Sequence, residues 1–244
     1  MESKPHTRQF ILKGLLWLGL IVAVIALVLG TYVFASSPAS IRTPELEHYH
    51  FRMQVVVDGQ DVDFSDDRFQ IAYSPNQCTG ELTTEPIHFH DKQDQFVHVH
   101  WAGMTGGLVL KNYGWNYIGG ADSILGYRLD TILNPQAVPI HGNELPKIDD
   151  SYSFYVYIGD ESGYTQKDFT DFVNQDLETF FGVASTFPVQ EGGNSDETIA
   201  ESLVRINNLL GNVVLFAQKE EPTDEEIMDR LNNLVPLTDS TCGG

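Results

Sequence analysis

The chain has 244 residues, 42% of them hydrophobic, which is enough for one packed domain or two small ones. Its 34 acidic residues outnumber 14 basic residues and give a formal net charge of −20. This charge argues against nucleic acid as a partner, because the phosphates would be repelled and the one basic cluster, Lys4, Arg8 and Lys13, only precedes an apolar segment.

The apolar segment covers residues 14–35 and contains 22 residues without a charge. As a helix rising about 1.5 Å per residue, it is long enough to cross the roughly 30 Å of bilayer hydrocarbon. The basic cluster precedes the segment, whereas every acidic residue except Glu2 follows it. The positive-inside rule therefore predicts a single-pass protein of the cell membrane, with a cytoplasmic tail (residues 1–13), a transmembrane signal anchor and an extracytoplasmic remainder. A signal peptide cleaved after Ala35 is the alternative and leads to the same compartment.

Residues 36–47 are predicted to be a linker, and the alternating pattern that follows predicts a mainly antiparallel β domain over residues 48–160. The candidate strands are residues 51–57, 69–73, 87–90, 96–101, 124–129 and 152–158. One short helix is expected to interrupt them, with Thr105 as its N-cap, residues 108–113 as its body and Gly114 as its stop.

The pattern then changes to helical spacing, which predicts a helical C-terminal region over residues 164–237 and a flexible tail over residues 238–244. Apolar side chains recur at this spacing over residues 165–181 and 196–210, and a capping box at Thr223 precedes a third helix. These helices are expected to pack on the β domain; docking of a protein partner or self-association is the alternative. The expected fold class is α+β.

Two cysteines, Cys78 and Cys242, follow the apolar segment. In an oxidising compartment they can form a disulfide that ties the C-terminal tail to the domain. Two free thiols, or Cys78 as a metal ligand, are the alternatives, and spacing alone does not decide among them.

Histidine is the residue type with the clearest pattern. Six of the eight histidines form three His-x-His pairs, which are His48/His50, His88/His90 and His98/His100. Residues i and i+2 of a strand point to the same face, so each pair can offer two imidazoles to one metal ion. A hairpin turn centred on Asp94 would place His90 opposite His98. The same turn would place His88 opposite His100, with all four rings on one face.

Such a group of nitrogen donors suits zinc, copper, nickel or iron, and we expect copper or zinc. The predicted ligands are His88, His90, His98 and His100, with His48 and His50 as further donors and Asp91 as an oxygen ligand. A pH-responsive or structural histidine cluster is one alternative, and histidines without a special role are another.

The sequence also resembles a known group of proteins. The order His48-Tyr49-His50, Val55-Val56-Val57-Asp58-Gly59, Ile87-His88-Phe89-His90-Asp91 and Val97-His98-Val99-His100 is followed by a Thr-capped helix near Gly114-Trp115. This order is similar to an uncharacterised His-rich extracytoplasmic domain of membrane-anchored archaeal and small-genome bacterial proteins. The resemblance covers residues 45–160, and it departs at His100, where many members place an acid. It implies the histidine site and no particular reaction.

These features predict a membrane-anchored extracytoplasmic metal-binding protein that acts as a copper or zinc carrier, buffer or sensor. A metalloenzyme on a small β scaffold, with Glu85 and Asp91 as candidate acids or bases, is one alternative. An interaction subunit without a metal is the other. The sequence contains no nucleophile elbow, phosphate loop or His-Glu-x-x-His motif that would identify a reaction.

Overall fold

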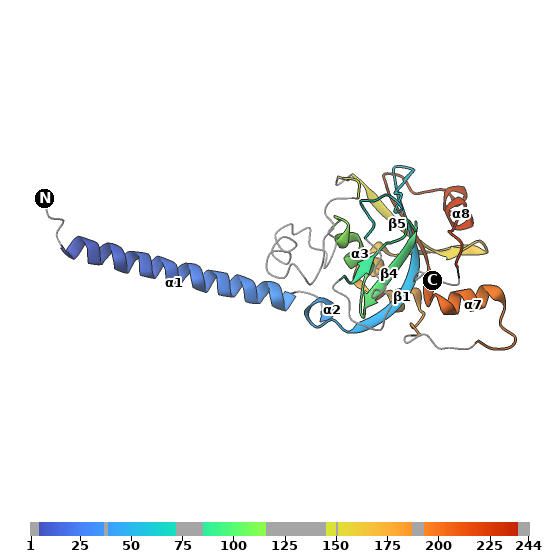
Figure 1. Ribbon diagram of the computed structural model, residues 1–244. Helices are drawn as coiled ribbons and strands as arrows, with labels where there is room; N and C mark the ends of the chain where they lie inside the picture. The colour runs from blue at the N-terminus through green and yellow to red at the C-terminus, as the bar shows by residue number, and fades with distance from the viewer. Residues whose placement is uncertain are drawn as a thin grey trace.

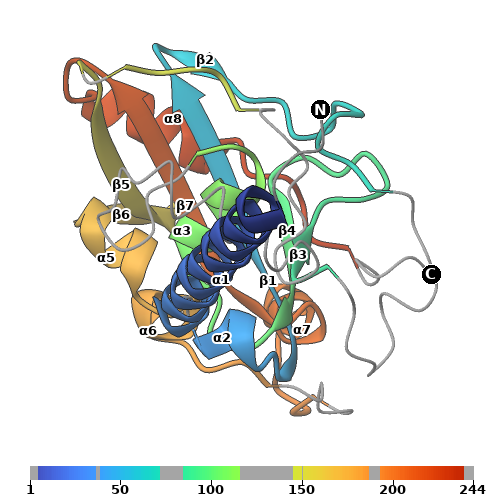
Figure 2. The ribbon, with the colours of Figure 1, turned by 90° about the vertical axis from the view of Figure 1, so that its left-hand side faces the viewer.

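The computed structural model describes residues 5–36, 39–71, 85–115, 145–149, 151–186 and 193–238. It combines an N-terminal helix, α1 (Pro5–Ser36), with a mixed domain built on a seven-stranded sheet. The expected α+β class is therefore confirmed. Figure 1 shows α1 extending away from the domain as a long rod, and Figure 2 views the same helix nearly end-on.

The apolar part of α1, Gln9–Tyr32, is 24 residues long and makes no buried contact with the domain. Its length and composition allow it to cross a bilayer, and they fit a membrane anchor and a signal sequence equally well. The predicted linker that follows contains a short helix, α2 (Ala39–Arg42), before the first strand begins at Leu46.

The sheet has the strand order β3-β4-β1-β7-β5-β6, with β2 paired to β1 across the turn at Asp58-Gly59. The strands are β1 (Leu46–Val57), β2 (Gln60–Asp61), β3 (Ile87–His88), β4 (Phe96–Trp101), β5 (Ser153–Asp160), β6 (Gly163–Lys167) and β7 (Leu209–Gln218). The central pair, β1 and β7, is parallel, whereas the other pairs are antiparallel. The sheet is thus mainly antiparallel, as expected.

The strands predicted over residues 51–57, 96–101 and 152–158 are confirmed in whole or in large part, and the strand predicted over residues 87–90 is confirmed for its first two residues. From the candidate strand at residues 69–73, Gln70 forms one isolated bridge with Phe89, and residues 72 and 73 are not described. The candidate strand at residues 124–129 lies outside the described residues.

The remaining helices are α3 (Gly106–Asn112), α5 (Phe169–Asn174), α6 (Leu177–Phe181), α7 (Ile199–Ile206) and α8 (Asp224–Asn232). The two predicted caps are confirmed. The Thr105 side chain accepts a hydrogen bond from Leu108 N at the start of α3, and Thr223 and Glu226 form the capping box of α8.

The expectation of a purely helical C-terminal region is wrong, because β7 runs through the centre of the sheet. The sequence predicts a single helix over residues 165–181. The first of these residues belong instead to β6, and the others form two short helices, α5 and α6. Asp168 and Asp176 each cap a new helix there, since their carboxylates accept backbone N–H groups. The helix expected to reach residue 210 ends at Ile206, before Asn208 adopts a left-handed conformation.

Alternation along β1 divides the sheet into two faces. Odd-numbered residues such as Phe51 and Val55 belong to the larger core, which also includes residues of α3, α5 and α6. Even-numbered Val56 belongs to a second core with Ile227 and Leu231 of α8. The even-numbered face of β1, β4 and β3 carries the histidines.

Candidate metal centre

The three His-x-His pairs lie on three adjacent strands. His48 and His50 belong to β1, His98 and His100 belong to β4, and His88 is in β3 with His90 two residues later. All six imidazoles are buried, with at most 9% of any of these residues exposed. The sheet therefore brings the β1 pair together with the four histidines of the hairpin.

The register between β3 and β4 differs from the predicted one by two residues. His88 is paired with His98, so the turn is centred on Gln93. A shift of two residues leaves the side-chain parity unchanged, so all the histidines remain on one face. The two expected ring contacts are also present. The ring centroids of His90 and His98 lie 4.1 Å apart, and those of His88 and His100 lie 4.7 Å apart.

His98 is the centre of the cluster. Its ring centroid lies 4.5 Å from that of His50 on one side. The centroids of His88 and His90 lie 5.1 Å and 4.1 Å away. Because β4 is flanked by β1 and β3, His98 has histidine neighbours from both adjacent strands.

Two groups of three histidines place one ring nitrogen each within 4.8 Å of one another. The first triad is His48, His50 and His98, and the second triad is His88, His90 and His98. Nitrogen ligands bind zinc at about 2.0–2.1 Å, so that donors on one ion lie roughly 3–4 Å apart. Either triad thus needs only small side-chain adjustments to hold an ion.

Two of the rings are oriented by a hydrogen bond on one nitrogen. His50 Nδ1 donates to the backbone carbonyl of Asn207, and its Nε2 lies 3.0 Å from Nδ1 of His98. His90 Nδ1 lies 2.8 Å from the Asp91 carboxylate. Metal-binding histidines usually donate their second N–H to a carbonyl or carboxylate, which fixes the tautomer and the ring plane. Asp91, expected as an oxygen ligand, belongs to neither triad and instead contacts His90.

His88 and His100 have no hydrogen-bond partner on either ring nitrogen within the part of the chain that the structure describes. A buried polar group without a partner destabilises a fold by about 1–3 kcal/mol, and such groups are rare unless an ion or another ligand explains them. His100 is stacked between His48 and His88, at centroid distances of 4.9 and 4.7 Å. The unbonded nitrogens therefore lie among the other candidate donors.

Burial favours the neutral form of five of the cluster imidazoles. It lowers the pKa of His48 to about 4 and that of His100 to about 3. For His50, His88 and His98, burial and then repulsion by neighbouring imidazoles hold the pKa well below its usual range. Since a neutral imidazole is the form that binds a metal, the cluster is ready to bind at neutral pH.

The residues after α8 form hydrogen bonds with two residues next to the histidine cluster, Gln95 and Asn207. Gln95, which precedes β4, accepts a hydrogen bond of 3.0 Å from Val235 N. Asn207, whose carbonyl holds His50, donates a side-chain hydrogen bond of 2.8 Å to the Thr238 carbonyl. The C-terminal segment and the turn after α7 thus help to fix the position of the β1 histidines.

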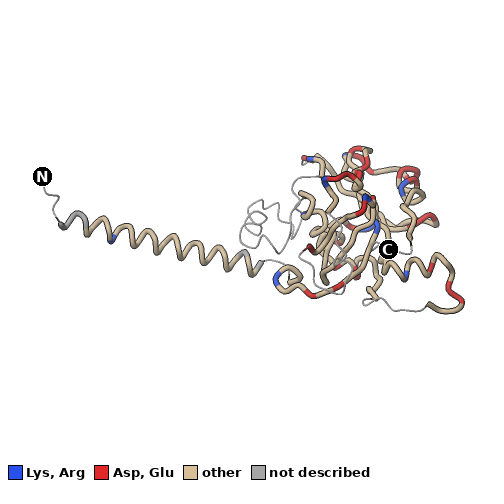
Figure 3. The backbone as a smooth tube through the Cα atoms, in the orientation of Figure 1, with Lys and Arg blue, Asp and Glu red and all other residues tan. Residues whose placement is uncertain are grey.

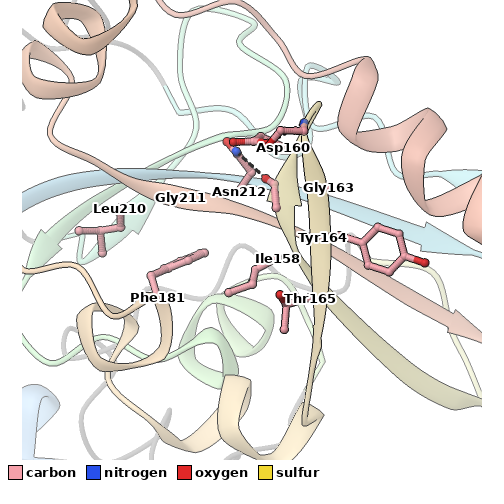
Figure 4. A pocket seen from close by; sticks show the side chains of 11 residues that line it. Ile158, Asp160, Gly163, Tyr164, Thr165, Phe181, Leu210, Gly211 and Asn212 are labelled. Atoms are coloured by element: carbon pink, nitrogen blue, oxygen red, sulfur yellow. Dashed lines mark hydrogen bonds between the residues drawn. The ribbon is translucent and has the colours of Figure 1, made fainter. Parts of the chain in front are cut away.

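Two hollows among the described residues lie elsewhere, and no histidine lines either of them. The hollow in Figure 4, of about 470 Å³, lies at the β5–β6 hairpin, and its lining includes Asp160, Tyr164, Phe181 and Asn212. The histidine cluster is a closed, buried site by comparison.

Cys78 and Cys242 lie outside the described residues, so their pairing stays a prediction, as does any ligand role for Cys78. His141 also lies outside the described residues.

A scan against models of protein families finds no matching family, and searches of curated proteins and of solved structures find no similar protein. The resemblance to the His-rich extracytoplasmic domain stays a prediction.

Proposed function

We propose that this chain is a membrane-anchored extracytoplasmic protein that binds copper or zinc through its buried histidines. The observation that carries the proposal is the pair His88 and His100, with four buried ring nitrogens that lack hydrogen bonds among the described residues and lie against other imidazoles. A neutral imidazole has one lone pair, so an ion bound there would satisfy one nitrogen of each ring and reduce the penalty of burying it.

The donor set supports copper or zinc. Each triad consists of three imidazoles, and the described residues contain no cysteine. Imidazole donors suit divalent copper and zinc, whereas magnesium and calcium prefer oxygen ligands. Copper(II) is expected to bind more tightly than zinc, because nitrogen sites generally have a higher affinity for copper(II) than for the other divalent first-row metals.

Charge and hydrophobicity support the proposed location. The sequence of α1 contains no acidic residue, and its two basic residues, Arg8 and Lys13, both precede the uncharged residues 14–35. Acidic residues are instead distributed along the backbone of the domain, as Figure 3 shows. This distribution favours a cytoplasmic N-terminus, and an acidic domain attracts metal cations from solution.

The closed site favours a carrier, buffer or sensor over an enzyme. A catalytic metal keeps an open coordination position that substrate can reach, whereas at most 9% of each cluster histidine is exposed. Neither described hollow leads to the histidines. We therefore assign binding and storage or delivery of the ion as the function.

The test is metal analysis of the full chain purified in detergent, first treated with a chelator and then loaded with copper or zinc. The wild-type protein is expected to retain stoichiometric metal, whereas the double variant His88→Ala/His98→Ala is expected to lose it. The matched control is His6→Ala/His141→Ala, which changes the two histidines outside the His-x-His pairs and should retain metal. Wild-type metal content no higher than that of the double variant would refute the proposal.

A further inference from the structure

The cluster contains more donors than one ion can use. An ion with four tetrahedral ligands would leave at least two of the six buried imidazoles without a metal. The two triads together use five histidines and share only His98. We propose that the cluster holds two transition-metal ions bridged by the imidazole of His98, an inference that rests on the metal-binding function proposed above.

The orientation of the His98 ring supports a bridge. Its Nδ1 lies 3.0 Å from Nε2 of His50, so this nitrogen is directed toward the first triad. Its Nε2 lies 3.5 Å from the side-chain oxygen of Gln93, in the turn between β3 and β4. The two nitrogens of one ring point in different directions, so Nδ1 serves the ion of the first triad and Nε2 serves the ion of the second.

The position of His98 in the sheet explains why this residue is the bridge. Its partner on β1 is His50 and its partner on β3 is His88, so a histidine faces it from each side. It is also fully buried, which excludes water as a competing ligand on the bridging ring. Substitution of any other histidine of the triads affects one triad only, whereas substitution of His98 affects both.

His100 provides a further donor next to both triads. It stacks on His48 of the first triad and on His88 of the second. Both of its ring nitrogens lack a hydrogen bond among the described residues. His100 is therefore placed to supply a fourth ligand to one of the two ions.

The bridge also reduces the charge of the buried site. A neutral imidazole carries one N–H, so the second ion forms its bond to His98 when this N–H bond breaks and the proton leaves to solvent. The resulting imidazolate carries one negative charge between two divalent cations. Asp91, in contact with His90, adds a second negative charge at the edge of the site.

The experiment is a copper(II) titration of the full chain in detergent, followed by electron paramagnetic resonance and metal analysis. The signal should grow up to one equivalent of copper and then fall toward background at two equivalents, because ions joined through one imidazolate are magnetically coupled. The variants His50→Gln and His90→Gln, which each alter one triad, should bind one copper with a full uncoupled signal. Circular dichroism checks that each variant is folded.

The outcomes separate this inference from the function on which it rests. Two coppers with an uncoupled signal in the wild type, or saturation at one copper, would refute the bridge while metal binding stands. Absence of bound copper in the folded wild-type protein would refute the metal-binding function itself.

Discussion

The buried histidines make the metal-free domain sensitive to mild acid. An imidazole in the unfolded chain has a pKa of about 6.5, whereas the folded domain lowers the pKa of His48 to about 4 and that of His100 to about 3. At a pH below about 6.5 and above the lowered pKa values, the histidines of the unfolded chain bind protons that those of the folded domain do not bind. The free energy of unfolding must therefore fall as the pH falls below about 6.5.

The size of the effect follows from the width of this window. Each such histidine reduces the free energy of unfolding by about 1.4 kcal/mol per pH unit, or roughly 2 kcal/mol between pH 6.5 and pH 5. His48 and His100 together give about 4 kcal/mol, and His50, His88 and His98 act in the same direction. Domains of this kind are stable by about 5–15 kcal/mol, so the metal-free form is expected to unfold near pH 5.

Two carboxyl groups oppose this trend. Burial raises the pKa of Glu47 and of Asp94, so protonation in acid favours the folded state at these positions. Both groups are only partly buried, and their effect is smaller than that of the histidines. The net sign remains a loss of stability in acid.

The assay is denaturant unfolding of the full chain in detergent with a chelator present, followed by circular dichroism between about pH 7.5 and pH 5. The variant His100→Leu removes one of the titrating groups, so its stability should fall by about 2 kcal/mol less over this range. An unfolding midpoint that stays constant from pH 7 to pH 5 in the wild-type protein would refute the reasoning.

The remaining predictions concern single substitutions in the site. His88→Leu should raise the stability of the metal-free domain by about 1–3 kcal/mol, because it removes two buried nitrogens without partners, and should weaken metal binding. Denaturant unfolding measures the stability of the metal-free variant, and a competitive titration measures its metal affinity. A metal-free variant that is less stable than the wild-type protein would contradict this prediction. Asp91→Asn should weaken metal affinity by about 10–100-fold, since the carboxylate orients His90. The competitive titration measures this, with Asp67→Asn on the exposed surface as the control; equal affinities would contradict it.

The face occupied by the histidines was predictable, but their register was not. The two side chains of a His-x-His pair stay on the same face of the sheet when the strand register shifts by two residues. The register itself depends on the turn between β3 and β4, which distant residues hold. Asp94 accepts a hydrogen bond from Phe64 N, and the Gln70 side chain accepts one from Lys92 N. No local pattern in the turn indicates these contacts.

Strand β7 was not predicted, also because its structure depends on residues far away in the sequence. Its run of apolar residues from Val213 to Ala217 is buried on both faces, so it lacks the alternation that identifies a half-buried strand. Such a run is compatible with a helix or a strand until its neighbours are known. Those neighbours are β1 and β5, both far away in the sequence.

Some parts of the site carry no signal in the sequence. The group that orients His50 is the backbone carbonyl of Asn207, and any residue type supplies a carbonyl. The side chain of Asp91, by contrast, directly follows a His-x-His pair, which made it a candidate while leaving open whether it binds the metal or orients a ligand.

The parallel pairing of β1 with β7 would also set the order of folding in a chain exported as proposed above. β1 is the first strand after the membrane segment, yet His50 pairs with Leu209 near the other end of the chain. In the proposed orientation, the first two histidines leave the membrane long before the strand that anchors them is synthesised. The sheet can close only after residues 209–218 have crossed, so the complete metal site would form only at the end of export, although its first two histidines would reach the outer compartment earlier.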